Sequence, residues 1–206
     1  MTEPDSAATR PPLGALVARL AAEPAVSSLT GRAQASLVVP DPAWAPVLAG
    51  ISEMSRRRPL VVAVPLASEA ERLAADLVEF LGAGAVELFP AWETLPFERV
   101  SPGVETMGRR MEVLWRLRTG DESLKVVVAP ARALVQRLGP HVEDIEPVVI
   151  APGDTVDPTE IVGDLVAAGY RREYQVEHRG EVAVRGSIVD VFPATADHPV
   201  RIDLWG

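Results

Sequence analysis

The sequence predicts an α/β fold: a parallel sheet with its helices, followed by a small α+β module with an antiparallel sheet. Short apolar runs rich in β-branched residues alternate with segments of helical periodicity, as in strands joined by crossover helices. This alternation stops at Gly139 and Pro140, a pair that interrupts regular structure. Beyond it, extended runs follow one another without a crossover helix, which favours antiparallel pairing.

The first part, residues 1–142, is predicted to hold four strands and five helices after a polar tail. Ser68 and Glu71 have the spacing of a capping box, and Gly82 suits the end of the same helix. The continuous apolar run at 60–64 is typical of a parallel strand covered on both faces. The other expected strands are 37–39, 86–89 and 126–128; helices are expected at 15–22, from Pro46, from Ser68, from Ser101 and Pro102, and at 132–137.

The second part, residues 143–206, is predicted to be a helix packed on an antiparallel sheet. Asp157 suits the N-cap of this helix, with Pro158 in its first turn and Gly169 at its end. A short strand is expected at 148–150. The extended runs are 173–178, 181–192 and 200–205, with a hairpin turn around His178 between the first two.

Composition excludes several classes of function. The chain has no cysteine, which rules out disulfides, thiol catalysis and thiolate metal sites. No apolar run approaches the roughly 20 residues that span a bilayer, and the polar N-terminus lacks a signal-peptide core, so a cytoplasmic protein is expected. The three histidines are scattered without a second ligand at helical spacing, and no metal site is expected.

Acidic charge is concentrated in the second part. Residues 143–206 contain 13 acidic and 5 basic residues, against a net charge of −9 for the whole chain. A surface that neutralises phosphates should be basic, so a protein partner is expected there rather than DNA. A DNA-binding role for Arg56–Arg58 and Arg109–Arg110 is disfavoured, because charge runs at helix ends and solvent faces are usually only solvated.

The phosphate-binding loop of nucleotide-binding α/β folds is missing. Such a loop follows the first strand and cradles phosphates with glycine N–H groups and a lysine. Here the corresponding turn contains Pro40, Asp41, Pro42 and Pro46, which removes donors and adds a repelling carboxylate. No glycine in the chain is followed by lysine. No cofactor and no catalytic constellation is therefore expected in this segment.

The aromatic and proline-rich loop at 89–97 is the second unusual feature. Its Trp92 either lines a site or packs as a plug over the sheet edge. The plug is favoured, because apolar residues in loops usually pack.

Several segments resemble the UvrB-like N-terminal module of the bacterial transcription-repair coupling factor (Mfd) family. The stretch from Trp92 to Pro102, W-E-T-L-P…S-P, resembles the form of the module in that family. Residues 168–171, 185–186 and 190–193 resemble sequence that the family shares with the repair helicase UvrB. The resemblance covers residues 13–206, and the missing phosphate loop separates the chain from UvrB itself.

The resemblance implies a degenerate helicase-like (RecA-type) subdomain in residues 1–142 and a UvrA-interaction module, truncated at its C-terminal end, in residues 143–206. UvrA is the damage-sensing ATPase of nucleotide excision repair. The implied function is a non-catalytic docking module that recruits UvrA to RNA polymerase stalled at DNA lesions. The parent protein would be a DNA translocase using ATP and Mg, and would contact polymerase and DNA through other domains. A UvrB-type ATPase and DNA-damage-binding domain is the alternative.

Strand alternation predicts where a partner would dock. Side chains of a strand point to opposite faces in turn, so Arg201 and Trp205 should face solvent while Val200, Ile202 and Leu204 face the helix. The same alternation, counted through the preceding run, puts Val182, Val184, Ile188 and Phe192 in the core and Arg185 outside. The resemblance implies that Arg185, Arg201 and Trp205 contact UvrA. Arginine and tryptophan are frequent interface hot spots. The alternative is an arginine–aspartate surface pair beside a tryptophan covered by further chain.

Overall fold

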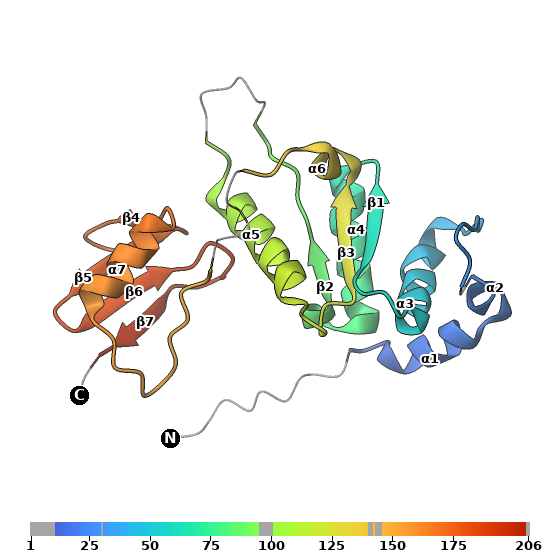
Figure 1. The fold of residues 1–206 in the computed structure, drawn as a ribbon, viewed down its shortest axis with the longest axis horizontal. Coiled ribbons are helices and arrows are strands. Elements are labelled where there is room, and N and C mark those ends of the chain that lie inside the picture. Colours follow the sequence, from blue (N-terminus) through green and yellow to red (C-terminus); the bar gives the residue numbers. More distant parts are fainter. Residues whose placement is uncertain (1–10, 30, 95–100, 140–141, 143–145, 205–206) are drawn as a thin grey trace. The chain divides into compact units, whose positions relative to one another are not determined.

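A computed structural model describes residues 11–29, 31–94, 101–139, 142 and 146–204 (Figure 1). The chain divides into two compact units. Unit 1 comprises Met1–Ala91 and Arg116–Arg137, and unit 2 comprises Trp92–Trp115 and Leu138–Gly206. Residues 92–115 thus belong with the C-terminal residues, whereas the sequence division near Val142 assigns them to the first part.

Unit 1 contains a parallel sheet, as predicted, but with three strands in the described residues in place of the four expected. Its strands are β1 (Leu60–Val64), β2 (Val86–Leu88) and β3 (Val126–Pro130), in the order β1-β3-β2. β3 is central, with Val126 in register with both Leu60 and Val86. All five residues of β3 are buried, which is why this strand is a continuous apolar run rather than an alternating one.

Helices pack against this sheet and against one another. α4 (Ala67–Leu81) contacts all three strands and buries a stripe of Ala70, Ala74 and Leu77 (Figure 1). α1 (Gly14–Ala22) packs on α3 (Trp44–Met54) at Gly50, where an added Cβ would lie 3.0 Å from the carbonyl carbon of Leu20. The remaining helices of the described part of this unit are α2 (Pro24–Ser27), η1 (Asp41–Ala43), η2 (Ala83–Ala85) and α6 (Ala131–Val135).

Three expectations for unit 1 were wrong. The edge strand β1 is not covered on both faces, since its residues alternate between half-buried and exposed and Val61 is 54% exposed. Residues 37–39 form no strand, since they pair with no strand of the described sheets, and Val38 is 97% exposed. The predicted capping box of α4 is also displaced. The helix begins at Ala67, and the side chain of Glu69 accepts a hydrogen bond from the N–H of Leu66 at 3.3 Å.

Unit 2 contains a four-stranded sheet in the order β4-β5-β6-β7. β5 (Glu181–Arg185), β6 (Ile188–Phe192) and β7 (Val200–Asp203) are antiparallel, as predicted, whereas β4 (Arg171–Arg172) runs parallel to β5. Residues 148–150 and 173–178 are not strands, and the turn around His178 therefore joins a parallel pair rather than a hairpin.

α7 (Pro158–Ala167) covers one face of this sheet (Figure 1). Its predicted cap is confirmed: Asp157 Oδ1 accepts a hydrogen bond from the N–H of Thr159 at 2.7 Å. Gly169, with a φ of 98°, ends the helix as expected. The core consists of Ile161, Val162 and Leu165 from the helix and of Val182, Val189 and Val191 from the strands.

The first turns of α5 (Val104–Thr119) belong to unit 2 for a steric reason. Gly180 has a φ of 79°, and an added Cβ there would lie 2.7 Å from Cγ1 of Val104. A Cβ added at Gly108 would lie 2.5 Å from the Cβ of Ala194. Close backbone approach therefore makes residues 104–108 part of the same packed unit as the sheet.

Candidate functional site

The candidate site is the face of the β5–β7 sheet opposite α7, called here the outer face. Its geometry follows from the strand register, in which Asp190 of β6 lies directly opposite Arg201 of β7 and Arg185 opposite Ile188. Cross-strand partners share a face, and the valines that alternate with these residues are buried under α7. The register therefore brings Arg185, Asp190 and Arg201 to one surface.

Arg201 and Asp190 form a bidentate ion pair. Nε of Arg201 donates to Oδ1 of Asp190 at 2.7 Å, and Nη2 donates to Oδ2 at 2.9 Å. Arg201 is 64% exposed, whereas Asp190 is only 19% exposed. The hydrogen bonds from Arg201 lower the pKa of Asp190 below its ordinary value, so this carboxylate stays charged near neutral pH.

Arg185 is held differently. Its Nη2 donates to the backbone oxygen of Tyr174 at 3.2 Å, and its guanidinium lies 5.1 Å from the centre of the Tyr174 ring. Among the residues that the structure describes, no carboxylate forms an ion pair with Arg185. Its positive charge is therefore open to a partner in a way that the charge of Arg201 is not.

These side chains surround a shallow hollow of about 460 Å³. Two arginines, one carboxylate and an exposed aliphatic residue offer hydrogen bonds, charge and a small apolar contact area together. The hollow is lined by Gln175, Val176, Arg185, Asp190, Pro199, Val200 and Arg201. Such a surface suits a protein partner, because it combines an arginine-rich rim with limited apolar area.

The structure places two of the three predicted contact residues together. Arg185 and Arg201 share the outer face, as strand alternation predicted. Trp205 lies outside the described residues. The arginine–aspartate surface pair that the sequence offered as the alternative is present for Arg201, with Asp190 as its partner. Sequence reasoning did not name Asp190, because the register depends on turn length, and it missed Tyr174, which fell in a segment expected to be a strand.

The predicted alternation was wrong for β6. Val189 and Val191 face α7, whereas Ile188 and Phe192 belong to the outer face. The prediction counted residues straight through the β5–β6 turn. Because Arg185 pairs with Ile188 across a two-residue turn, even-numbered residues of β5 share a face with odd-numbered residues of β6. Phe192 instead lies 5.6 Å below the guanidinium of Arg179.

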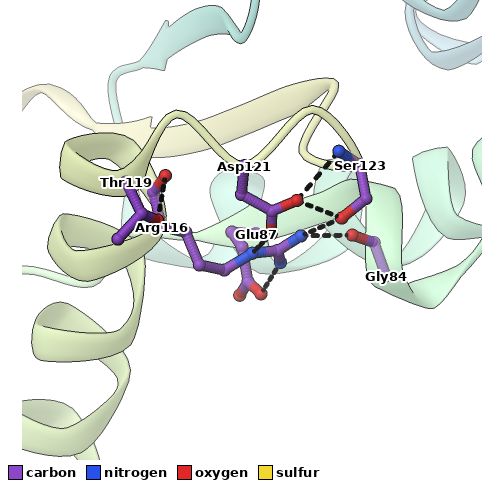
Figure 2. Close-up of polar contacts among 6 residues, drawn as sticks. All are labelled: Gly84, Glu87, Arg116, Thr119, Asp121 and Ser123. Carbon is purple, nitrogen blue, oxygen red and sulfur yellow. Dashed lines mark hydrogen bonds and ion pairs between the residues drawn. The ribbon is translucent and has the colours of Figure 1, made fainter. Parts of the chain in front are cut away.

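A second polar cluster, in unit 1, surrounds Arg116 near the end of α5 (Figure 2). Its Nε donates to Asp121 Oδ2 at 2.7 Å, and its Nη2 donates to the oxygen of Gly84 at 2.6 Å and to the hydroxyl of Ser123 at 3.0 Å. Nη1 pairs with Glu87 of β2. With only 9% of its side chain exposed, Arg116 stabilises the packing of α5 against β2 and the turn before β3, and it does not face a partner.

Trp92 and Arg110 form a third cluster, within unit 2. Arg110 is fully buried, with its guanidinium 4.3 Å from the centre of the Trp92 ring. Burial lowers the pKa of Arg110 below its ordinary value. Trp92 thus packs, as expected for a plug, although against α5 rather than a sheet edge. The expectation that Arg110 lies at a solvent face was wrong.

Neither a metal site nor a membrane helix emerges from the residues that the structure describes. No three of their histidine, aspartate or glutamate side chains gather in a way that could hold an ion. None of their helices combines the length and apolarity that crossing a bilayer requires.

Comparison with known proteins gives a consistent result. Residues 148–206 match the family model of the UvrB interaction domain. The whole chain aligns at 40% identity over 214 residues with the transcription-repair-coupling factors of Mycobacterium bovis and Mycobacterium tuberculosis, and covers 17% of their length. The corresponding factor of Escherichia coli is 30% identical over 183 residues, which are 87% of this chain and 14% of that protein. The chain thus spans a small part of the curated relatives it matches.

Proposed function

Because this chain is a homologue, along its whole length, of one segment of the transcription-repair-coupling factors, we propose that it is a docking module for a UvrA-type protein. The match of residues 148–206 to the UvrB interaction domain supports this proposal, since that match covers the whole outer face. In this proposal the module is non-catalytic and acts in the cytoplasm. It recruits UvrA to RNA polymerase stalled at DNA lesions, and other parts of a longer protein contact the polymerase and DNA.

The observation that carries the proposal is the pair of exposed arginines on the outer face. Arg185, at the end of β5, and Arg201, of β7, line one hollow across β6, and neither is needed to fill the core. Arginine is enriched among residues that dominate interface energetics, because its planar fork can donate several hydrogen bonds at once. Two such residues on one sheet face are more easily explained by a partner than by folding.

Calorimetric titration with purified UvrA tests the proposal. Arg185→Ala, Arg201→Ala and Trp205→Ala should each weaken binding by about 2 kcal/mol, a change of roughly thirtyfold. The effect on Trp205 follows from the resemblance, and those on the arginines follow from the outer face as well. A matched control is Arg172→Ala, which removes an exposed arginine in register with the buried Val182, on the face that carries α7. This control should bind UvrA normally.

Thermal unfolding keeps the experiment interpretable. Arg185→Ala should change the free energy of unfolding by no more than about 0.5 kcal/mol, as at other surface sites. Arg201→Ala leaves Asp190 without its partner, so it is compared with the double variant Asp190→Asn/Arg201→Ala, which removes both charges. Normal UvrA binding by folded Arg185→Ala and folded double variant would place the docking surface elsewhere.

A further inference from the structure

Tyr174 is an aromatic residue that is largely exposed and does not belong to the core of unit 2. It is 87% exposed and lies in the irregular segment between β4 and β5, next to Gln175 and Val176 of the hollow. An aromatic ring left in water forgoes the stabilisation that burial of the same ring would provide. The ring nonetheless has a defined neighbour, because the guanidinium of Arg185 lies 5.1 Å from its centre.

The contacts of Arg185 show how Tyr174 restricts its movement. One hydrogen bond goes to the backbone oxygen of Tyr174, at 3.2 Å, and the guanidinium lies over the ring of the same residue. A guanidinium has five N–H donors, and stacking on an aromatic ring uses its face rather than its edge. Arg185 thus keeps most of its donors while losing much of its conformational freedom before a partner arrives.

The two arginines of the outer face are therefore not equivalent. Arg201 already gives two donors to Asp190, which neutralises its charge. Arg185 forms no ion pair with a carboxylate of the described residues. Arg185 acts on Asp190 only through space, so its N–H donors are not taken up by a carboxylate of the described residues, and its fork matches a carboxylate in shape and sign.

We propose that Tyr174 is a positioning residue for partner recognition: its ring holds Arg185 at the rim of the hollow so that the free donors take a carboxylate of the UvrA-type partner. This inference rests on the proposed docking function. Pre-ordering an arginine lowers the entropy lost on binding, because a free arginine would have many rotamers to lose.

The test is UvrA binding by Tyr174 variants of the 206-residue chain. Tyr174→Ala keeps the backbone oxygen and removes only the ring, so binding should weaken about tenfold, the size of a partly desolvated cation–π contact. Tyr174→Phe keeps the ring and should bind within about twofold of the original chain. The double variant Tyr174→Ala/Arg185→Ala should bind like Arg185→Ala alone, because the ring acts through the arginine.

Salt dependence provides a second readout. Arg185→Ala and the double variant should show a flatter decline of UvrA affinity with salt than the original chain, since the lost contact is between charges. If the effects of Tyr174→Ala and Arg185→Ala add in the double variant, or if Tyr174→Phe binds as weakly as Tyr174→Ala, the inference is wrong. If Arg185→Ala and the Asp190→Asn/Arg201→Ala variant both bind UvrA normally, the proposed docking function itself is wrong.

Discussion

Asp190 orients Arg201 as much as it neutralises it. A bidentate pair fixes the plane of the guanidinium, and the half-buried aspartate anchors that plane to β6. Exposed ion pairs contribute little to folding, because water screens them and two long side chains must be ordered. The ion pair therefore matters mainly for the orientation of the Arg201 guanidinium, whereas its contribution to the free energy of unfolding should be small.

The carboxylate of Asp121 illustrates a residue whose charge does support the fold. Hydrogen bonds from Ser123, then from Arg116, lower its pKa from 3.8 to about 2 (Figure 2). A carboxyl group with a lower pKa in the folded chain than in the unfolded chain stabilises the fold above the unfolded pKa. This stabilisation should disappear as the pH falls from about 4 towards about 2.

Asp121→Asn should accordingly reduce the acid sensitivity of unfolding. The melting temperature of the variant should be lower than that of the original chain at neutral pH, and the two should converge as the pH approaches about 2. The adjacent exposed Glu122 provides the control, since Glu122→Gln should leave the pH profile unchanged. A constant difference between Asp121→Asn and the original chain across this range would show that the charge of Asp121 is not responsible.

At the scale of elements, the β5–β6 hairpin decides which side of the sheet becomes core. Gly186, with a φ of 62°, and Ser187 form its two-residue turn. This turn sets Val184 against Val189 and Val182 against Val191, which places four valines on the side of α7. The same register leaves Arg185 and Asp190 outside, so one turn determines both the core and the docking surface.

Two valines on the α7 face of this sheet differ in how far they are covered, since Val200 is in register with the buried Val191 but lies on the edge strand β7. Val189 is fully buried under α7, whereas Val200 is 50% exposed. Val189→Ala should lower the free energy of unfolding by about 2 kcal/mol, because it removes buried methyl groups and leaves a cavity. Val200→Ala removes the same atoms and should change it by less than about 0.5 kcal/mol. Equal costs in chemical denaturation would contradict the observed difference in burial.

Most elements could be predicted because their signals are local. The β-branched runs at β1 and β3 and the cap at Asp157 depend only on neighbouring residues. Pairing is not local, which explains the failures. Residues 37–39 have strand composition but pair with no strand of the described sheets. The cap of α4 uses Glu69 rather than Glu71 because Leu66 lies at the helix start.

The docking surface could be predicted only in part, for the same reason. Arg185 directly follows the core residue Val184, and Arg201 directly precedes the core residue Ile202. Simple alternation along each strand therefore places both arginines outside. The contribution of Asp190 requires the β6–β7 register, and that of Tyr174 requires the path of an irregular segment. Neither can be read from spacing along the chain.

At the scale of the whole molecule, charge argues against nucleic acid as a ligand. The chain has a net charge of −9, and Arg110 is buried. Arg56, Arg57 and Arg58 are exposed, but they form a short run at the end of α3 rather than a stripe. Phosphate neutralisation needs several cations arranged along one surface.

The chain should therefore bind duplex DNA more weakly than about 100 μM at physiological salt, the weak end of non-specific binding. Fluorescence anisotropy with damaged and undamaged duplexes measures this. Tighter binding that falls steeply with salt, and that is lost when Arg56, Arg57 and Arg58 are changed to alanine, would support a DNA-binding role instead.

The contact between Gly108 and Ala194 has a consequence for protein engineering. Because a Cβ at position 108 would lie 2.5 Å from the Cβ of Ala194, residue 108 cannot gain a side chain while the chain at Ala194 stays in place. Helix α5 and the loop after β6 are therefore coupled at this point, although they are far apart in the sequence. A chimaera that joins this chain's region after Val142 to a relative's N-terminal part with a larger residue at position 108 would clash here, so a transplanted module should include the start of α5.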